Sequence, residues 1–498
     1  MLRRVSLAGL LGVVCFAQTP TFHAGTRLVE VEVVVRGNGG PVTGLTRDDF
    51  MVLDQGKPQR IDVFRAGQST TDMPAVPLVP GAVSNRVNHA GEALPTATVV
   101  LFDQLNTRLD LKDYERKAML KLIRGLEARD RVAIYALGRN LHVLQEFTDD
   151  PGKLLAAVRH LDSGRDLMPA NVNDALFDFP TDMTGRIEEL TLGDPQTKAM
   201  YKASIQRGAE TEALVYAANN DWTTVEALRR IVEHLSGMPG RRNLIWIKED
   251  PIVPTPVMGM LLQSGIHLYP VLIRTVDFSA PDFMGTQRAG RVLAAATGGA
   301  GFDDAGDLQL ALKTAEEDSE SAYMLGYYPA EDTLDGKYHR LSVTVAGEKS
   351  ARLEVRYRPG YLAATQEIAM AAPPPQVAIA ELFRNPLDAT GLGLTARVEP
   401  DSRPGLHKVR LTVDLHDVHL EREGNRSRGR IEMAFPVGTK ARIRPIDIDL
   451  TDAQLAGVLK TGYELMATGV EASGNAIRVV VRDSATGVAG SLKIPLRP

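Results

Sequence analysis

The residues best placed to bind a ligand come directly after a short apolar run, Val99–Phe102. Asp103 ends this run, and the polar turn behind it carries Asn106 and Thr107. Ligands of wound α/β sheets bind beyond the carboxyl ends of the strands, so a carboxylate at this position is a candidate binding group. The alternative is that Asp103 only accepts hydrogen bonds at the start of the helix that follows.

A helix is expected after this turn, because apolar residues recur there at helical spacing. These residues are Leu111, Tyr114, Ala118, Leu122 and Leu126. A second apolar run, Asn243–Ile247, is also followed by acids, Glu249 and Asp250. If both runs are parallel strands of one sheet, their carboxyl ends meet at one edge and bring Asp103 close to Glu249. The alternative for the second pair of acids is a solvated turn before Pro251.

Strand and helix patterns alternate from residue 96 to residue 320, which predicts an α/β domain with a doubly wound, mostly parallel sheet. The further strands expected are 131–137, 141–147, 243–247 and 267–273, with 141–147 as an edge hairpin. The further helices expected are 150–161, 225–235, 287–296 and one that begins at Asp307. Residues 163–221 interrupt the alternation, contain a predicted helix near 195–218, and are interpreted as an insertion.

Alternating apolar residues predict β-structure on both sides of this domain. Residues 26–66 and 321–363 are each too short to close a core, so we expect them to pair as one β-sandwich around the α/β domain. Residues 67–95 and the proline-rich residues 364–376 are predicted linkers. Residues 377–498 predict a separate C-terminal β-sandwich of the immunoglobulin (Ig-like) kind.

The first residues, MLRRVSLAGLLGVVCFAQTP, are typical of a secretory signal peptide, here residues 1–17 with cleavage after Ala17. No later segment is apolar for long enough to cross a membrane, so we expect a secreted or periplasmic protein with no transmembrane segment in the mature chain. Cleavage would remove Cys15, which is the only cysteine, so no disulfide is expected. The net charge of -5 gives no basic surplus for a nucleic-acid partner.

Short stretches spread over nearly the whole chain carry a family resemblance. They are Val42–Leu45 with Asp49–Phe50, Leu101–Asp103 with Leu105–Thr107, Pro239–Trp246, Ala296–Gly299, Tyr323–Pro329 and Arg358–Tyr361. In this order they resemble the von Willebrand factor A (VWA) domain, and the whole chain looks like the bacterial VWFA-related family typified in acidobacteria. The resemblance implies a VWA/Rossmann-like sheet, and adhesion or protein assembly rather than catalysis.

The resemblance also implies a divalent cation such as Mg²⁺ at the carboxyl edge of the sheet. In the family it is held by an aspartate-x-serine-x-serine turn, a threonine from a second loop and an aspartate after the fourth strand. Asp103 matches the first position of the turn and Thr107 the third. Leu105 stands at the second position, where a hydroxyl is expected, and it cannot bind a cation.

The remaining ligands are less closely matched. Glu249 falls near the expected aspartate, with Asp250 beside it, and Thr223 or Thr224 are the candidates for the threonine. The alternative for Thr223 is a capping box with Glu226, three residues further on. The predicted metal ligands are Asp103, Thr107, Thr223 and Glu249, and the predicted partner-binding residues are Asn106 and Asp250.

We therefore expect an exported, non-enzymatic protein that binds a protein partner through a degraded cation site. One alternative is a metal-assisted hydrolase that uses Asp103 and Glu249, although the sequence offers no convincing general base. Another is an inert structural spacer. His416 and His419 are expected to lie on the surface, because their spacing alone is poor support for a zinc site.

Overall fold

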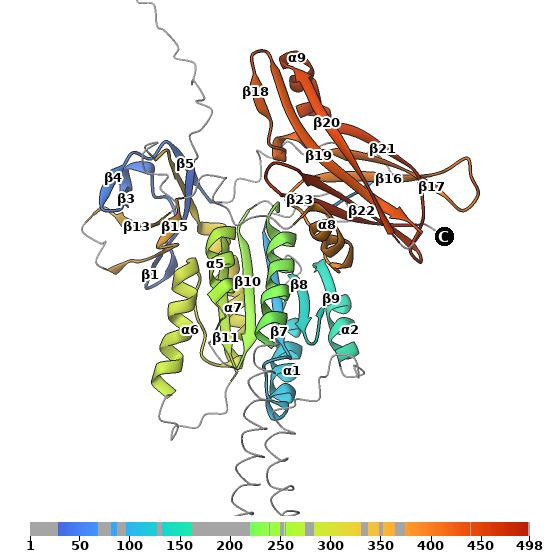
Figure 1. Cartoon of the computed structure of the whole chain (residues 1–498). Coiled ribbons are helices and arrows are strands. Elements are labelled where there is room, and N and C mark those ends of the chain that lie inside the picture. Colours follow the sequence, from blue (N-terminus) through green and yellow to red (C-terminus); the bar gives the residue numbers. More distant parts are fainter. Residues whose placement is uncertain are drawn as a thin grey trace, which may run out of the picture.

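The computed structural model describes residues 28–67, 81–86, 96–126, 132–161, 220–238, 240–249, 253, 255–273, 283–329, 337–347, 352–363, 374–438 and 440–496. They form three bodies, namely an N-terminal β-sandwich, a domain built on a mixed sheet, and a C-terminal β-sandwich (Figure 1). The predicted signal peptide, the predicted insertion up to residue 219 with its helix near 195–218, and Asp250 lie outside the described residues.

The central domain is built on a mixed sheet whose strand order is β11-β10-β7-β8-β9. Its strands are β7 (Ala97–Asp103), β8 (Val132–Leu137), β9 (Leu141–Thr148), β10 (Arg242–Lys248) and β11 (Ile266–Leu272). Neighbouring strands are parallel except β8 and β9, which are antiparallel. Strands β7, β8 and β11 are buried along their whole length, which explains their continuous apolar sequences.

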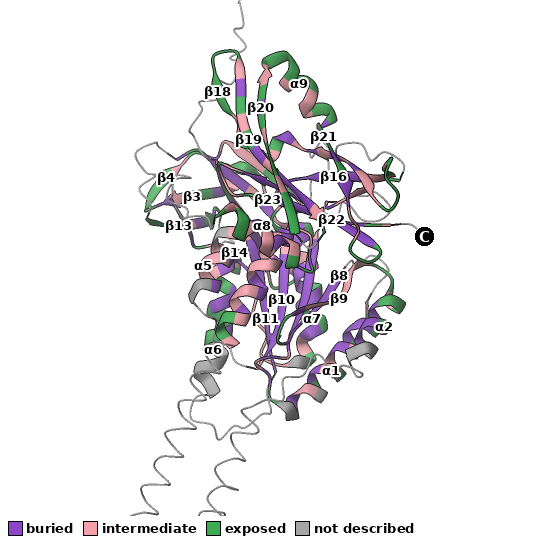
Figure 2. Cartoon of the chain, turned by 45° about the vertical axis from the view of Figure 1, so that its right-hand side comes forward, coloured by how far each residue is buried: buried purple, intermediate pink, exposed green. Residues whose placement is uncertain are grey.

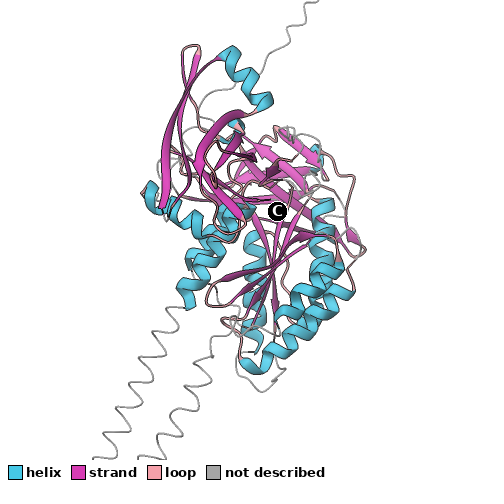
Figure 3. Ribbon diagram, turned by 90° about the vertical axis from the view of Figure 1, so that its right-hand side faces the viewer, coloured by secondary structure: helices cyan, strands magenta, loops and turns pink. Residues whose placement is uncertain are grey.

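Helices cover both faces of the mixed sheet (Figure 3). One face packs on α1 (Leu109–Arg124), α2 (Pro151–Leu161) and α7 (Leu308–Ser321), which follows the short η2 (Ala305–Asp307). The other face packs on the helical residues 220–235, α5 (Thr255–Ser264) and α6 (Phe283–Thr297). Within the described part of the chain, no helix has both the length and the apolar character needed to cross a membrane.

The N-terminal sandwich is made from two segments that flank the mixed-sheet domain in sequence. One sheet contains β1 (Val29–Gly37), β2 (Gly40–Pro41), β5 (Val63–Ala66), β12 (Tyr323–Tyr327) and β14 (Glu354–Tyr357). The other contains β3 (Phe50–Asp54), β4 (Lys57–Gln59), β13 (Tyr338–Val345) and β15 (Gly360–Leu362), with η1 (Arg47–Asp49) before β3. β1 pairs with β12 and β14, and β3 pairs with β13, so neither segment forms the core alone.

Buried charges join this sandwich to the mixed-sheet domain. Glu32 of β1 makes an ion pair with Arg241, which precedes β10, at 3.1 Å between Oε2 and Nη1. The same carboxylate contacts Nε2 of His267 on β11. Asp318 of α7 is fully buried and accepts a hydrogen bond of 2.8 Å from Arg36 of β1. The charges are buried but paired, which is the condition under which proteins tolerate them.

The C-terminal sandwich packs two antiparallel sheets around one apolar core. The first contains β6 (Val83–Ser84), β16 (Leu394–Pro400), β17 (His407–Val413) and β21 (Tyr463–Val470). The second contains β18 (Glu421–Glu423), β19 (Arg426–Val437), β20 (Lys440–Thr451), β22 (Ala476–Asp483) and β23 (Ala489–Pro495). Its helices are α8 (Pro375–Arg384) and α9 (Asp452–Thr461), with η6 (Leu415–Asp417) after β17.

Both predicted linkers contribute to this C-terminal body. β6 lies inside predicted linker 67–95 and pairs with β16, and α8 begins inside predicted linker 364–376. Burial differs between the sheets, since β7, β8, β10 and β11 of the mixed sheet are almost wholly buried while β18, β20 and α9 are largely exposed (Figure 2).

The predicted fold class, an α/β protein with a doubly wound, mostly parallel VWA/Rossmann-like sheet, is wrong for this chain. Four of the five sheets that the structure describes are antiparallel, and the fifth is mixed. The fifth sheet is mixed because a short turn, Gly138–Asn140, sends β9 back beside β8, and so short a connection permits only an antiparallel pair. The chain is a β-rich protein in which sandwiches flank one mixed sheet.

Candidate functional site

Asp103 lies at the carboxyl end of β7 and is fully buried. The turn after β7 folds back onto it, because Asn106 donates a backbone hydrogen bond of 3.0 Å to Oδ1 of Asp103. The Asn106 side-chain Nδ2 also donates to both carboxylate oxygens, at 2.9 and 3.0 Å. The same Nδ2 lies 3.2 Å from Oγ1 of Thr224, so Asn106 ties the turn to the helical residues 220–235.

Two further charged side chains are buried near Asp103. Burial raises the pKa of Asp103, and the positive charge of Lys248 at the end of β10 opposes that rise, as do hydrogen bonds from Asn106. Glu115 of α1 has a pKa well above its ordinary value, first because it is buried and then because Asp103 is negatively charged. Its Oε2 accepts a hydrogen bond from Gln104. The charge of Asp103 is thus offset from within the protein.

Glu249 belongs to the same edge of the sheet. Its Oε2 accepts a hydrogen bond of 2.9 Å from the backbone N–H of Arg108, and its Oε1 lies 2.8 Å from Nε of the same arginine. These contacts join the residue after β10 to the turn after β7. The structure therefore brings Asp103, Asn106 and Glu249 to one edge, where Thr224 contacts Asn106 and its neighbour Thr223 is half-buried.

The side chains at this edge offer a magnesium ion few oxygens that are not already hydrogen-bonded. Oδ1 of Asp103 accepts two N–H groups of Asn106 and Oδ2 accepts one, which leaves part of the carboxylate open. Thr107 is fully buried and its hydroxyl donates to the backbone carbonyl of Asp103 at 2.6 Å. Leu105 offers no oxygen. Over the described residues, no three His, Cys, Asp or Glu side chains are grouped so that they could hold a metal. The cation site stays a prediction.

Lys248 and Glu115 were not predicted as site residues, although the sequence around each indicates a buried polar group. Glu115 lies four residues after Leu111, on the helix face that packs on the sheet, and a carboxylate on an apolar face marks a buried polar group. Lys248 directly follows the buried run of β10. The two histidines that the sequence predicts on the surface make separate contacts. His416 pairs with Asp414, and the backbone N–H of His419 donates to Asp483.

A second candidate site is a cleft of about 1280 Å³ between the mixed-sheet domain and the C-terminal sandwich, here named the interdomain cleft. It is lined by β6 and the two residues after it, by β9, by the end of the helical residues 220–235, by the end of α8 with the loop behind it, and by parts of β22 and β23. Sequence reasoning could not find it, because its walls come from segments far apart in the chain.

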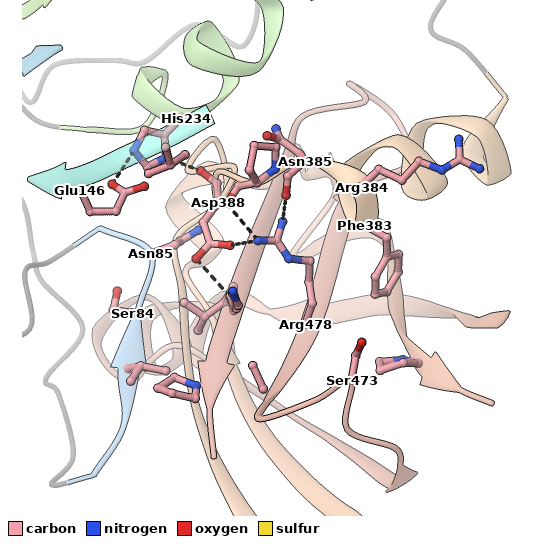
Figure 4. Close-up of a pocket in the computed structure, with 18 of the residues that line it drawn as sticks. Ser84, Asn85, Glu146, His234, Phe383, Arg384, Asn385, Asp388, Ser473 and Arg478 are labelled. Carbon is pink, nitrogen blue, oxygen red and sulfur yellow. Dashed lines mark hydrogen bonds and ion pairs between the residues drawn. The ribbon is translucent and has the colours of Figure 1, made fainter. Parts of the chain in front are cut away.

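His234 and Glu146 face each other across the boundary of the cleft (Figure 4). Nε2 of His234 lies 3.6 Å from Oε2 of Glu146, which is the distance of an ion pair rather than a hydrogen bond. Burial lowers the pKa of His234, but Glu146 together with the carbonyl and charge of Asp388 outweighs it, so the net shift is upward. Nδ1 of His234 lies 2.6 Å from the carbonyl oxygen of Asp388, in the C-terminal body.

Asp388 and Arg478 form the polar centre of the opposite wall (Figure 4). Nη2 of Arg478 lies 3.2 Å from Oδ1 of Asp388. The guanidinium also donates to the carbonyls of Leu382 and Leu387, each at 3.2 Å, and to that of Asn385. Burial raises the pKa of Asp388 and the charge of Arg478 opposes that rise. The arginine thus fixes the loop between α8 and β16.

The domains meet beside the cleft through close backbone contacts. Thr390 donates its hydroxyl to the carbonyl of His234 at 2.6 Å and accepts the N–H of Gly237 at 2.9 Å. A Cβ on Gly237 would lie 1.7 Å from the carbonyl oxygen of Thr390, so only glycine allows this approach. Arg86 binds the same carbonyl oxygen, at 3.1 Å through Nε and 3.0 Å through Nη2.

No family model and no curated protein matches the chain. Among solved structures, it is similar to three N-terminal domains of the type V pili tip protein Mfa5 from Porphyromonas gingivalis, at 10% sequence identity and a TM-score of 0.19. That match covers 88% of this chain and 77% of the other. A TM-score this low establishes no common fold, so the resemblance to the VWA family stays a prediction.

Proposed function

We propose that this is an exported, non-enzymatic protein that binds a protein partner at the carboxyl edge of the mixed sheet. The carboxyl edge comprises Gln104–Arg108, Thr224 and Glu249. The main support for the proposal is the contact of Glu249 with Arg108. This contact joins the ends of β10 and β7, which the sequence analysis predicted to form one binding site. Export is proposed from the signal-like residues 1–17.

The edge offers a partner a small polar surface on a rigid base. The side chain of Arg108 is 52% exposed and that of Glu249 is 24% exposed, while Gln104 and Asn106 are half-buried. Beneath them, the buried Asp103 accepts three hydrogen bonds from Asn106. A fixed arginine with exposed donors is a common anchor in protein interfaces.

We propose further that this binding needs no divalent cation. In a cation-dependent edge, the metal neutralises the buried carboxylate and carries the partner's acid. Here the charge of Lys248 acts on Asp103, and Asn106 donates hydrogen bonds to both of its oxygens. A non-enzymatic role is supported because neither candidate carboxylate is free to act as a base, since Glu249 is paired with Arg108.

The test is capture of a partner from an envelope extract by the immobilised mature chain, with and without a chelator. We expect the captured protein to be the same in both. Arg108→Glu should reduce its capture about tenfold, since it reverses the exposed charge at the edge. Lys121→Glu is the matched control, because it makes the same charge change at an exposed position of α1.

The outcomes separate the parts of the proposal. Equal capture by Arg108→Glu and the wild type would mean that the carboxyl edge is not the binding surface. Loss of capture with the chelator alone would overturn cation independence and favour the predicted Mg²⁺ site. An equal loss of capture in Lys121→Glu would mean that the effect comes from the overall charge of the protein and not from the carboxyl edge.

A further inference from the structure

We propose that the interdomain cleft is a second binding site, which takes an acidic, extended peptide segment of a partner protein. It shares no residue with the carboxyl edge, so it stands apart from the function proposed above. Its volume of about 1280 Å³ lies above the range of roughly 300–1,000 Å³ usual for small-molecule sites. The cleft is therefore sized for a polymer segment.

The charges that line the cleft are mostly positive. They are Arg86, Arg384, Lys440, Arg478 and Lys493, against the acids Glu146 and Asp388.

Both acids are already matched, because Glu146 faces His234 and Asp388 faces Arg478. Arg384, Lys440 and Lys493 are exposed and make no ion pair with any residue that the structure describes. The cleft thus presents unmatched positive charge, which favours an anionic ligand.

A buried polar group with an unmet hydrogen bond also lines the cleft. Asn385 is 2% exposed, and its Nδ2 has no hydrogen-bond partner among the described residues. The orientation of the amide is fixed, because its Oδ1 accepts the N–H of Leu387 at 3.0 Å. Buried N–H groups are nearly always paired in proteins, so this one can donate to any acceptor that reaches it, such as a carboxylate, a peptide carbonyl or a water.

The walls of the cleft favour an extended chain over a compact anion. β9 is the last strand of the mixed sheet, and it lines the cleft. An edge strand carries backbone N–H and C=O groups that an extended peptide can pair with. Phe147 and Phe383, both half-buried, add apolar surface between the charges. A peptide that alternates acidic and apolar side chains suits such a surface.

The test uses the full mature chain and a fluorescein-labelled decapeptide of alternating glutamate and valine, with binding followed by fluorescence anisotropy. The variant Lys440→Glu/Lys493→Glu reverses two unmatched charges. Its control, Lys57→Glu/Lys460→Glu, makes the same charge change at exposed lysines of β4 and α9. We expect the cleft variant to bind about tenfold more weakly and the control to bind within about twofold of the wild type.

Three further arms make the result decisive. A lysine–valine decapeptide should not bind, and binding of the acidic peptide should weaken as salt is raised. Hydrogen exchange of 141–147 and 380–386 should slow when the acidic peptide is bound, a readout that needs no variant.

Several results would overturn the proposal. They are an unaffected cleft variant, an equal loss in the control, equal binding of the basic peptide, or unchanged exchange in these segments. Cleft-dependent binding of heparin without binding of the acidic peptide would also overturn it, in favour of an anionic polysaccharide.

Discussion

At the scale of single residues, the carboxyl edge depends on how one buried negative charge is compensated. Asp103 has no exposure to water, and its pKa is raised by burial against the opposing charge of Lys248. Lys248 is itself only 3% exposed. A buried charge is tolerated when an opposite charge and hydrogen bonds surround it, and here the lysine and Asn106 partly offset the cost of burying Asp103.

Replacing Lys248 with methionine should destabilise the mixed-sheet domain, because Asp103 would be left buried without its opposing charge. We expect a loss of about 3 kcal/mol. Asp103→Asn combined with Lys248→Met should recover part of this loss, since no charge then remains to be compensated. Urea unfolding of the two single variants and the double variant gives the coupling free energy, and a value near zero would mean that the two groups do not interact.

Glu115 is a second buried carboxyl group near Asp103, and it should respond differently to substitution. Burial and the negative charge of Asp103 raise its pKa well above the ordinary 4.5, so the neutral acid persists to higher pH than in a free glutamate. Glu115→Gln, which keeps the shape and removes only the ability to ionise, should therefore change stability by less than about 0.5 kcal/mol. A large effect on the urea midpoint would show instead that Glu115 is charged in the folded protein.

Glu32, between the N-terminal sandwich and the mixed-sheet domain, should make stability depend on acid pH. Burial opposes its ionisation, but His267 and Arg241 outweigh burial and lower its pKa to about 2 from 4.5. Because the folded pKa is depressed, this stabilisation is present above pH 4.5 and is lost as the pH falls toward 2. Glu32→Gln should cost about 3 kcal/mol near neutral pH, since it removes the carboxylate that is paired with the buried Arg241.

The measurement is the difference in urea midpoint between wild type and Glu32→Gln as the pH is lowered. The difference should shrink below pH 4.5 and nearly vanish close to 2. A difference that does not change with pH would mean that Glu32 contributes through packing alone.

At the scale of elements, the mixed sheet positions the candidate binding groups. β7 and β10 are neighbours and parallel, so the residues after them, Gln104–Arg108 and Glu249, emerge at one edge. Buried β-branched and aromatic residues on both faces fix the register of these strands, because a slip of one residue would exchange the residues that face the two helix layers. The edge is therefore held by the core.

The C-terminal sandwich contacts the mixed-sheet domain at the end of the helical residues 220–235. Gly237→Ala should disrupt this junction, because the added Cβ would lie 1.7 Å from the carbonyl oxygen of Thr390. We expect a cost of about 2 kcal/mol or more, and a C-terminal sandwich that is cleaved more readily in limited proteolysis. Gly259→Ala in α5 is the control, since a Cβ there meets nothing within 4 Å and should stabilise the helix by about 0.5–1 kcal/mol. Equal protease resistance in both variants would contradict the role of Gly237.

At the scale of the whole molecule, the mixed-sheet domain has a β-sandwich on each side in sequence and contacts both. The N-terminal sandwich is held by buried ion pairs, and the C-terminal sandwich by the loop that contains Asp388 and Thr390. The interdomain cleft lies beside this second junction. Movement of the C-terminal sandwich would therefore change the shape of the cleft.

The junction beside the cleft should be sensitive to pH through His234. Its pKa is raised above 6.5, since Glu146 and the carbonyl and charge of Asp388 together outweigh burial. Its stabilisation is therefore full below pH 6.5 and is lost as the pH rises through the raised value. Glu146, whose pKa is lowered despite burial because His234 faces it, contributes fully above about pH 4.5 and less as the pH falls below it. Asp388, whose own pKa is raised by burial, and its partner Arg478 also face this pair.

The C-terminal sandwich should thus be held most tightly to the mixed-sheet domain between about pH 4.5 and 6.5, and less tightly above pH 6.5. The measurement is hydrogen exchange of residues 385–392 as a function of pH, after correction for the intrinsic rates. His234→Gln should remove the pH dependence, and a variant that kept it would assign the effect to another group.

The sequence by itself determined the local structure. Continuous apolar runs predicted the strands around Val99–Phe102 and Asn243–Ile247, and helical spacing predicted the helix after Asp103, because these patterns reflect burial that the chain carries residue by residue. Strand ends at a shared edge could also be inferred, which placed Asp103 and Glu249 in one candidate site.

Only the tertiary structure decided what lies across a sheet or between bodies. The fold class was predicted wrongly because the way strands assemble into sheets depends on partners far apart in the chain, which a local pattern of apolar residues does not encode. Lys248 beside Asp103, β6 in the distant sandwich and the walls of the interdomain cleft all join residues far apart in the chain. Such contacts arise from packing, so they could be seen only once the chain had been folded.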